Sequence, residues 1–97
     1  MINRDAVLAI LREYKRENAR RYGIIDLGLF GSVARQTAGE NSDVDICIKI
    51  QTPDPFILVH IKEDLEQRVH AHVDIVRVRE KMNLFLKSRI EQEGVYV

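Results

Sequence analysis

The sequence predicts an α/β fold, in which a small mixed β-sheet is packed with helices. Segments with apolar residues at helical spacing alternate along the chain with short segments typical of strands. Such alternation favours a central sheet covered by helices. Residues 43–50 also alternate strictly between apolar and polar side chains, which requires one core face and one polar face. With 97 residues the chain has room for one small core, so we expect a single domain over residues 1–97.

The first expected element is a helix close to the amino terminus. Asn3 is a residue type that caps helices, because its side chain accepts a hydrogen bond from a free backbone N–H of the first turn. Apolar side chains follow at helical spacing, namely Val7, Leu8, Leu11 and Tyr14. One face of this helix is therefore expected to pack on the core.

A strand and a brief helix are expected next. The short apolar segment Ile24–Phe30 lies between Gly23 and Gly31, which is typical of a strand. Residues 32–37 follow it directly and are expected to form a brief helix. Residues 39–42 are rich in turn-forming types and predict a loop.

The second half of the chain predicts two more strands and two more helices. Residues 43–50 form a strand with Asp45 and Cys47 on its polar face. After two prolines comes a helix whose apolar stripe consists of Ile57, Ile61, Leu65 and Val69. Residues 73–78 predict the third strand. The last helix is marked by Met82, Phe85, Leu86 and Ile90, and Gly94 ends it.

The composition indicates an ordinary soluble protein of the cytoplasm. Fifteen basic and fifteen acidic residues cancel, so no global charge favours nucleic acid, and we expect no direct nucleic-acid partner. The single cysteine, Cys47, excludes an internal disulfide and a cysteine-rich zinc site, which fits a reducing compartment. Charged residues interrupt every apolar run near the amino terminus, so we expect neither a signal peptide nor a membrane span.

Three aspartates are the candidate catalytic residues. Asp43 and Asp45 lie two apart on a predicted strand, so their carboxylates project from the same face and repel each other. Asp74 lies near the start of the next strand, between two apolar residues that point to the core. If the intervening helix makes these strands parallel neighbours, all three acids meet. Three such carboxylates can hold two magnesium ions about 3.5–4 Å apart, the arrangement used for in-line phosphoryl displacement. Asp74 is also a candidate general base.

Gly31 and Ser32 are the candidate phosphate-binding residues. They follow the first strand and open the brief helix, where glycine permits close approach and free N–H groups face an anion. This turn meets the aspartates only if the first two strands are antiparallel, which would make the sheet mixed. Each feature alone has a simpler explanation: Gly31 as a strand terminator, the Asp43–Asp45 pair as a solvated turn, and Asp74 as a buried acid paired with Arg77 or Arg79. Their combination favours one site.

The combined pattern resembles a known superfamily. Gly31-Ser-Val-Ala-Arg35 precedes Ser42-Asp-Val-Asp-Ile46 with ten residues between Ser32 and Asp43, and Asp74 follows in His-Val-Asp-Ile-Val. This looks like the signature of the DNA polymerase β-like nucleotidyltransferases, and it is specifically similar to the minimal nucleotidyltransferases, the MNT proteins. The resemblance covers almost the whole chain and implies the polymerase β-like nucleotidyltransferase fold.

The resemblance also implies roles for these residues. In that family the three acids bind metal and the Gly-Ser pair holds the triphosphate, so we expect two Mg²⁺ ions at the acids and ATP at Gly31 and Ser32. Arg35 is expected to help neutralise the triphosphate. Many relatives have glycine after this arginine where this chain has Gln36, which leaves the loop shape and the role of Arg35 open. His70 and His72 lack the further ligands of a zinc site and are expected to be exposed or satisfied.

The expected function follows from the same resemblance. MNT proteins commonly serve as antitoxins to HEPN ribonucleases, and one mode of neutralisation is AMP transfer from ATP to a tyrosine of the toxin. We therefore expect a nucleotidyltransferase with a HEPN-type toxin as partner, in a homo- or hetero-oligomer. A second hypothesis is a binding module that neutralises the toxin by masking alone. A third, nucleotide transfer to a small molecule, is less favoured because we expect no added substrate domain.

Overall fold

The computed structural model describes residues 2–97, and four strands in it form one sheet. The elements along the chain are α1 (Arg4–Tyr22), β1 (Ile24–Phe30), α2 (Gly31–Arg35), β2 (Val44–Ile50), α3 (Pro55–Val69), β3 (Val73–Arg77), α4 (Leu84–Glu93) and β4 (Val95–Tyr96). The strand order is β3-β2-β1-β4. β1 runs antiparallel to both β2 and β4, whereas β2 and β3 are parallel. The predicted mixed sheet, with its antiparallel first pair and parallel second pair, is confirmed.

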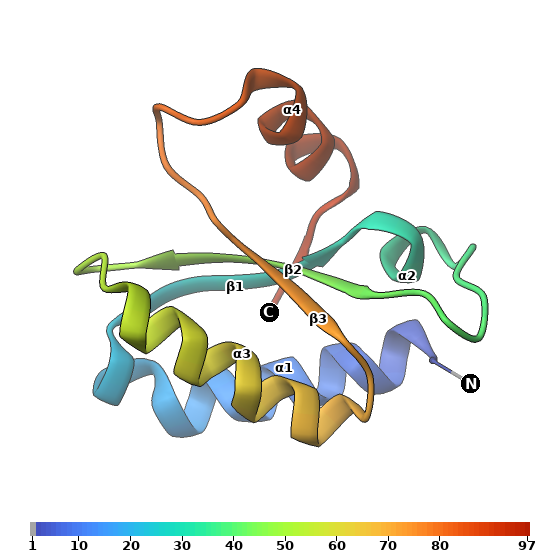
Figure 1. Ribbon diagram of the computed structural model, residues 1–97, viewed down its shortest axis with the longest axis horizontal. Coiled ribbons are helices and arrows are strands. Elements are labelled where there is room, and N and C mark those ends of the chain that lie inside the picture. The colour runs from blue at the N-terminus through green and yellow to red at the C-terminus, as the bar shows by residue number, and fades with distance from the viewer. Residues whose placement is uncertain (1) are drawn as a thin grey trace.

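The helices cover the two faces of the sheet unequally. The long helices α1 and α3 lie side by side on one face, and the shorter α2 and α4 lie on the other (Figure 1). The main core is sandwiched between the sheet and the two long helices and includes Leu11, Leu27, Ile46, Ile61 and Leu65. None of the helices within residues 2–97 is long and apolar enough to cross a membrane.

The first helix forms as its sequence predicts. The Asn3 side chain accepts a hydrogen bond from the Ala6 N–H at 3.1 Å, which satisfies a free donor of the first turn. The four predicted core residues of α1 are all buried. Tyr14 is fully buried, and its hydroxyl donates to the Asp64 carboxylate of α3 at 2.8 Å. This bond joins the two long helices, and it gives the buried Tyr14 hydroxyl a hydrogen-bond partner.

A smaller apolar cluster lies on the opposite face of the sheet. It consists of Phe30, Cys47 and Ile90, with Leu86 packed against it. Cys47 is fully buried, so the prediction that this side of β2 is polar is wrong at that position. The reason is α4, whose buried Ile90 covers the sheet there and removes Cys47 from water.

Several element boundaries differ from the prediction. The brief helix spans Gly31–Arg35 rather than residues 32–37, and the last helix begins at Leu84 with Asn83 as its cap. Strand β4 was not predicted, since two residues carry no periodicity. It pairs with β1 where Gly28 leaves space, because a Cβ there would approach the Tyr96 ring to 2.9 Å.

Gln36 ends α2 in the left-handed conformation, with φ 62° and ψ 33°. A side chain costs about 1–2 kcal/mol in this region, and glycine avoids that cost. We therefore expect Gln36→Gly to raise the free energy of unfolding by about 0.5–1 kcal/mol after the greater freedom of unfolded glycine is subtracted. Urea unfolding measures the change. Gln67→Gly, within α3, is the control and should lower stability by about 1 kcal/mol. An equal loss in both variants would contradict the strain at Gln36.

Candidate active site

The strand pairing brings the predicted residues to one end of the sheet. Asp45 on β2 pairs with Phe30 at the end of β1 on one side and with Asp74 on β3 on the other. Asp43 lies just before β2. Gly31, which follows Phe30 directly, therefore lies beside the acids, as the antiparallel arrangement of the first two strands requires.

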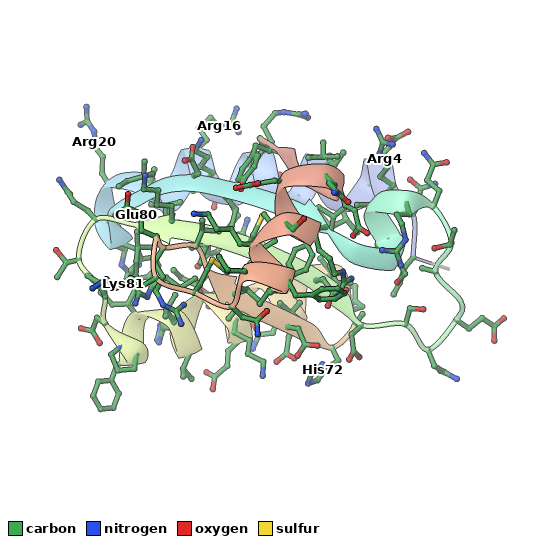
Figure 2. The ribbon with its side chains drawn as sticks, turned by 90° about the horizontal axis from the view of Figure 1, so that it is seen from above. Arg4, Arg16, Arg20, His72, Glu80 and Lys81 are labelled. Atoms are coloured by element: carbon green, nitrogen blue, oxygen red, sulfur yellow. The ribbon has the colours of Figure 1, made fainter. Side chains whose placement is uncertain are left out.

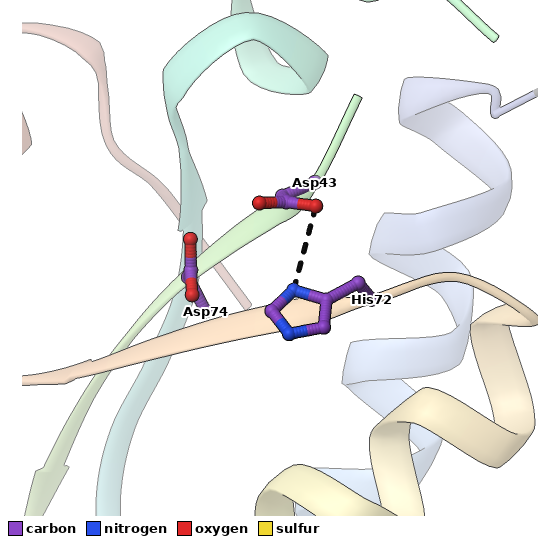
Figure 3. Close-up of side chains that lie close together, drawn as sticks. All are labelled: Asp43, His72 and Asp74. Atoms are coloured by element: carbon purple, nitrogen blue, oxygen red, sulfur yellow. Dashed lines mark ion pairs between the residues drawn. The ribbon is translucent and has the colours of Figure 1, made fainter. Parts of the chain in front are cut away.

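Asp43, His72 and Asp74 form a close cluster of possible metal ligands (Figure 3). One ligand atom of each lies within 4.8 Å of the others. His72 Nδ1 is 3.4 Å from Asp43 Oδ1, and its Nε2 is 3.9 Å from Glu66 Oε2. Asp74 is exposed, and the ion pairs within residues 2–97 do not join it to Arg77 or Arg79, so it is not the buried, paired acid of the alternative hypothesis.

The two carboxylates of this cluster suit a hard divalent cation, whereas the His72 imidazole supplies a nitrogen that magnesium does not prefer. Carboxylate oxygens are the ligands that magnesium prefers, and an exposed cluster leaves positions for water and substrate oxygens. A cation would also remove the repulsion between Asp43 and Asp74. Asp45 is not part of the close cluster, but it lies next to Asp74 across the strand pair and is affected by the charges of both other acids.

Asp45 has an altered acidity. Burial raises the pKa of its carboxyl group above the ordinary aspartate value, and the negative charges of Asp74 and Asp43 raise it further. The positive charges of Arg89 and Arg35 act in the opposite direction. The ionised form of Asp45 is thus the form that most needs a counter-charge.

This raised pKa predicts a pH dependence of stability in the metal-free protein. The folded state holds the Asp45 proton more tightly than the unfolded chain, so stability falls as the pH rises from about 4, the ordinary value, through the raised pKa. Asp45→Asn removes the titrating group and should not show this part of the loss. Thermal unfolding of both proteins with a chelator from pH 4 to 7 measures it. Parallel curves would show that Asp45 titrates normally.

Gly31 has two properties that require glycine. Its φ is +77°, a region that side chains rarely adopt, and a Cβ there would collide with the Asp45 carboxylate. The Gly31 N–H donates to Glu93 Oε2 of α4 at 3.2 Å. The backbone of the predicted phosphate-binding turn therefore lies directly against the Asp45 carboxylate, with no space for a side chain between them. The Gly31 N–H is bonded to the carboxylate of Glu93.

The other two predicted nucleotide-binding residues lie on α2. Arg35 is exposed and forms an ion pair with Glu93, with 2.9 Å between Nη1 and Oε2. Ser32 is partly exposed, and its carbonyl oxygen accepts from the Thr37 N–H at 2.9 Å. The structure thus brings Gly31, Ser32 and Arg35 to the acid-bearing end of the sheet.

Two residues at this site, Arg89 and Glu93, were missed by the sequence analysis. His72 is exposed, as expected, but it also lies with Asp43 and Asp74 in a cluster that was not expected to include it. Arg89 and Glu93 lie four apart on α4, the spacing of neighbours on one helix face, but nothing in the sequence says that α4 lies over the site. Figure 2 shows α4 lying across the sheet, while Arg16 and Arg20 of α1 project from the edge opposite His72.

Comparison with known proteins identifies clear relatives. The nucleotidyltransferase domain family matches residues 11–97 of this chain. Protein adenylyltransferase MntA of Thermococcus cleftensis is 31% identical over 98 residues, an alignment that covers 100% of this chain and 98% of that protein.

Solved structures share the fold. A minimal nucleotidyltransferase superposes with a TM-score of 0.77 at 26% identity, covering 96% of this chain and 94% of its own. The MNT–HEPN complex of Shewanella oneidensis, whose HEPN toxin is tri-AMPylated, matches with a TM-score of 0.71 at 19% identity, covering 96% of this chain and 70% of that one. At this identity the second likeness concerns the fold alone.

Proposed function

This chain belongs to the nucleotidyltransferase domain family, and from that premise we propose that it transfers AMP from ATP to a hydroxyl group of a partner protein. One observation carries the proposal: Asp43 and Asp74 lie close together at the same end of the sheet where Gly31 contacts Asp45. The relative from Thermococcus cleftensis, matched along its whole length, is named a protein adenylyltransferase, which supports the choice of acceptor.

The three aspartates are the proposed metal ligands. One carboxylate oxygen of Asp43 and one of Asp74 lie within 4.8 Å of each other, close enough to share a cation, and Asp45 adjoins both the cluster and the turn. We assign two Mg²⁺ ions to these carboxylates; such ions supply charge stabilisation for an attacking and a leaving oxygen. His72 Nδ1 lies 3.4 Å from Asp43 Oδ1, so the imidazole adjoins the proposed metal ligands.

The proposed nucleotide site consists of Gly31, Ser32 and Arg35. Their backbone N–H groups and the guanidinium donate to phosphate oxygens, which orients the α-phosphorus toward the acids. The attacking hydroxyl oxygen forms a bond to the α-phosphorus, the bond from that phosphorus to the bridging oxygen breaks, and pyrophosphate leaves. Asp74 is an exposed member of the cluster and is the proposed acceptor of the hydroxyl proton.

The proposed acceptor is a tyrosine of a cognate HEPN ribonuclease toxin. The acids lie on an exposed part of the described chain, so a partner protein can deliver a side chain to them directly. AMP near a ribonuclease site places a bulky anion where RNA phosphates bind, so inhibition follows from sterics and charge repulsion. We further propose that residues 1–97 act as one minimal nucleotidyltransferase domain in the cytoplasm, where ATP and the toxin are both available.

The deciding experiment mixes this protein with its toxin, ATP and magnesium. Intact-mass spectrometry of the toxin is expected to show added AMP, and its ribonuclease activity is expected to fall in step. Omitting magnesium, or adding a chelator, should prevent both changes. If the toxin is silenced without a change in mass, and the Asp43→Asn protein silences it equally well, neutralisation is by masking and the transfer proposal is wrong.

A further inference from the structure

Glu93 contacts one backbone N–H and two arginines at the proposed triphosphate site, through one hydrogen bond and two ion pairs. Its Oε2 atom accepts from the Gly31 N–H at 3.2 Å, lies 2.9 Å from Arg35 Nη1 and lies 3.8 Å from Arg89 Nη2. Gly31 and Arg35 belong to the turn and helix after β1, whereas Arg89 and Glu93 belong to α4. A single carboxylate oxygen therefore collects one backbone N–H and two guanidinium groups from two separate elements.

This set of donors is suited to a phosphate. A glycine N–H and two arginines that converge on one oxygen are the groups that recognise phosphoryl oxygens, and arginine does so with parallel N–H donors. Each arginine side chain is partly exposed, at 43% for Arg35 and 38% for Arg89, so both guanidinium groups remain accessible to an incoming anion. The Glu93 carboxylate occupies the place of that anion.

Arg89 lies close to the reacting end of the sheet. Its guanidinium carbon is 5.8 Å from the centre of the Phe30 ring, and Phe30 pairs directly with Asp45. Its positive charge also lowers the pKa of Asp45, opposite to the larger effect of burial. A triphosphate held between Gly31 and the acids would therefore lie within the field of Arg89.

We propose that Arg89 is a second triphosphate-binding arginine, and that Glu93 occupies the shared anion site until a nucleoside triphosphate displaces it. This inference rests on the proposed function and adds a residue and a competitor to the same site. Displacement frees the Gly31 N–H, Arg35 and Arg89 together, and their new partner carries more negative charge than a carboxylate. Glu93 thus lowers the affinity of the site for weak or singly charged anions and favours the magnesium complex of a triphosphate.

The test is calorimetric titration of the full chain with ATP and magnesium. We expect Arg89→Gln to weaken binding about tenfold, the loss of one charge-assisted contact, and Arg89→Lys to recover part of it. Glu93→Gln should tighten binding about fivefold, because a charged carboxylate no longer competes with the triphosphate for the site. In the Glu93→Gln background, Arg89→Gln should still weaken binding about tenfold.

Matched controls come from the same helix and from the far side of the molecule. Glu91→Gln on α4 and Arg12→Gln on α1 make the same charge changes at exposed positions away from the site, and both should leave the affinity unchanged. Thermal unfolding of each variant verifies folding. Unchanged affinity in Arg89→Gln, or weaker binding in Glu93→Gln with a lowered Tm, would show that this pair only anchors α4 and would overturn the inference. A wild-type chain that binds no ATP with magnesium would overturn the proposed function as well.

Discussion

Asp45→Asn is expected to lower the rate of AMP transfer to the toxin by about 10³-fold, since loss of a metal-binding carboxylate removes roughly 4 kcal/mol of transition-state stabilisation. Asp43→Asn should have an effect of the same order. Folding should survive both changes. The carboxylate of Asp45 is partly buried beside Asp74 and Asp43, and an amide of the same shape removes the repulsion among them. In the metal-free state the Asp45→Asn protein should therefore unfold at a temperature equal to or above that of the wild type.

The control for this experiment is Asp26→Asn. Asp26 is an exposed carboxylate on β1, the strand next to β2, and it lies away from the acid-bearing end of the sheet. Its replacement should leave the transfer rate unchanged. Rates are measured by intact mass of the toxin at fixed time points, and stability by thermal unfolding with a chelator. Full transfer activity in either site variant would show that these aspartates are not the catalytic acids.

Gly31→Ala is expected to lower both stability and transfer. The backbone at Gly31 has φ +77°, where an alanine costs about 1–2 kcal/mol. The new methyl group would also overlap the Asp45 carboxylate, so that side chain must move away from its place beside the turn. A displacement of this kind at a reacting centre reduces rate by about 100-fold. We therefore expect transfer to fall by at least that factor while the protein remains largely folded.

Gly39→Ala is the matched control for this substitution. The nearest atom to a Cβ at Gly39 is Ser42 Oγ at 4.0 Å, and the residue lies in the loop between α2 and β2, whereas Gly31 begins α2. Urea unfolding and the transfer assay should show little change for this variant. Equal losses at Gly31 and Gly39 would mean that the effect does not depend on closeness to Asp45, and would contradict a specific contact between Gly31 and Asp45.

The fold was predictable where periodicity and turn residues agree. The alternation over residues 43–50 identified β2, and the spacing of Val7, Leu8, Leu11 and Tyr14 identified the buried face of α1. The parallel pair followed from the helical crossover between the second and third strands, and the antiparallel pair from the requirement that the Gly31 turn meet the acids. Strand β4 was not predictable in this way, because its existence depends on space beside Gly28 on another strand.

The candidate site was predictable only in the part that a linear motif encodes. Asp43, Asp45, Asp74 and the Gly31 turn lie at strand ends, so local spacing is sufficient to place them near one another. Arg89 and Glu93 reach the site from α4, whose position depends on the docking of Ile90 onto Phe30 and Cys47. The burial of Cys47 was missed for the same reason. A long-range packing contact leaves no periodic signal in either segment.

The unequal covering of the two sheet faces has a consequence for how the molecule opens. The α1–α3 face contains most of the buried side chains, and the Tyr14–Asp64 bond ties its two helices together. Within residues 2–97, the α4 face is held by a small cluster of three buried residues, Phe30, Cys47 and Ile90, with partly buried side chains such as Leu86 packed against it. Local unfolding requires the least free energy where the fewest apolar contacts break. We therefore expect backbone amides of α4 to exchange with solvent deuterium through partial openings, and those of α1 and α3 to exchange more slowly, through larger openings.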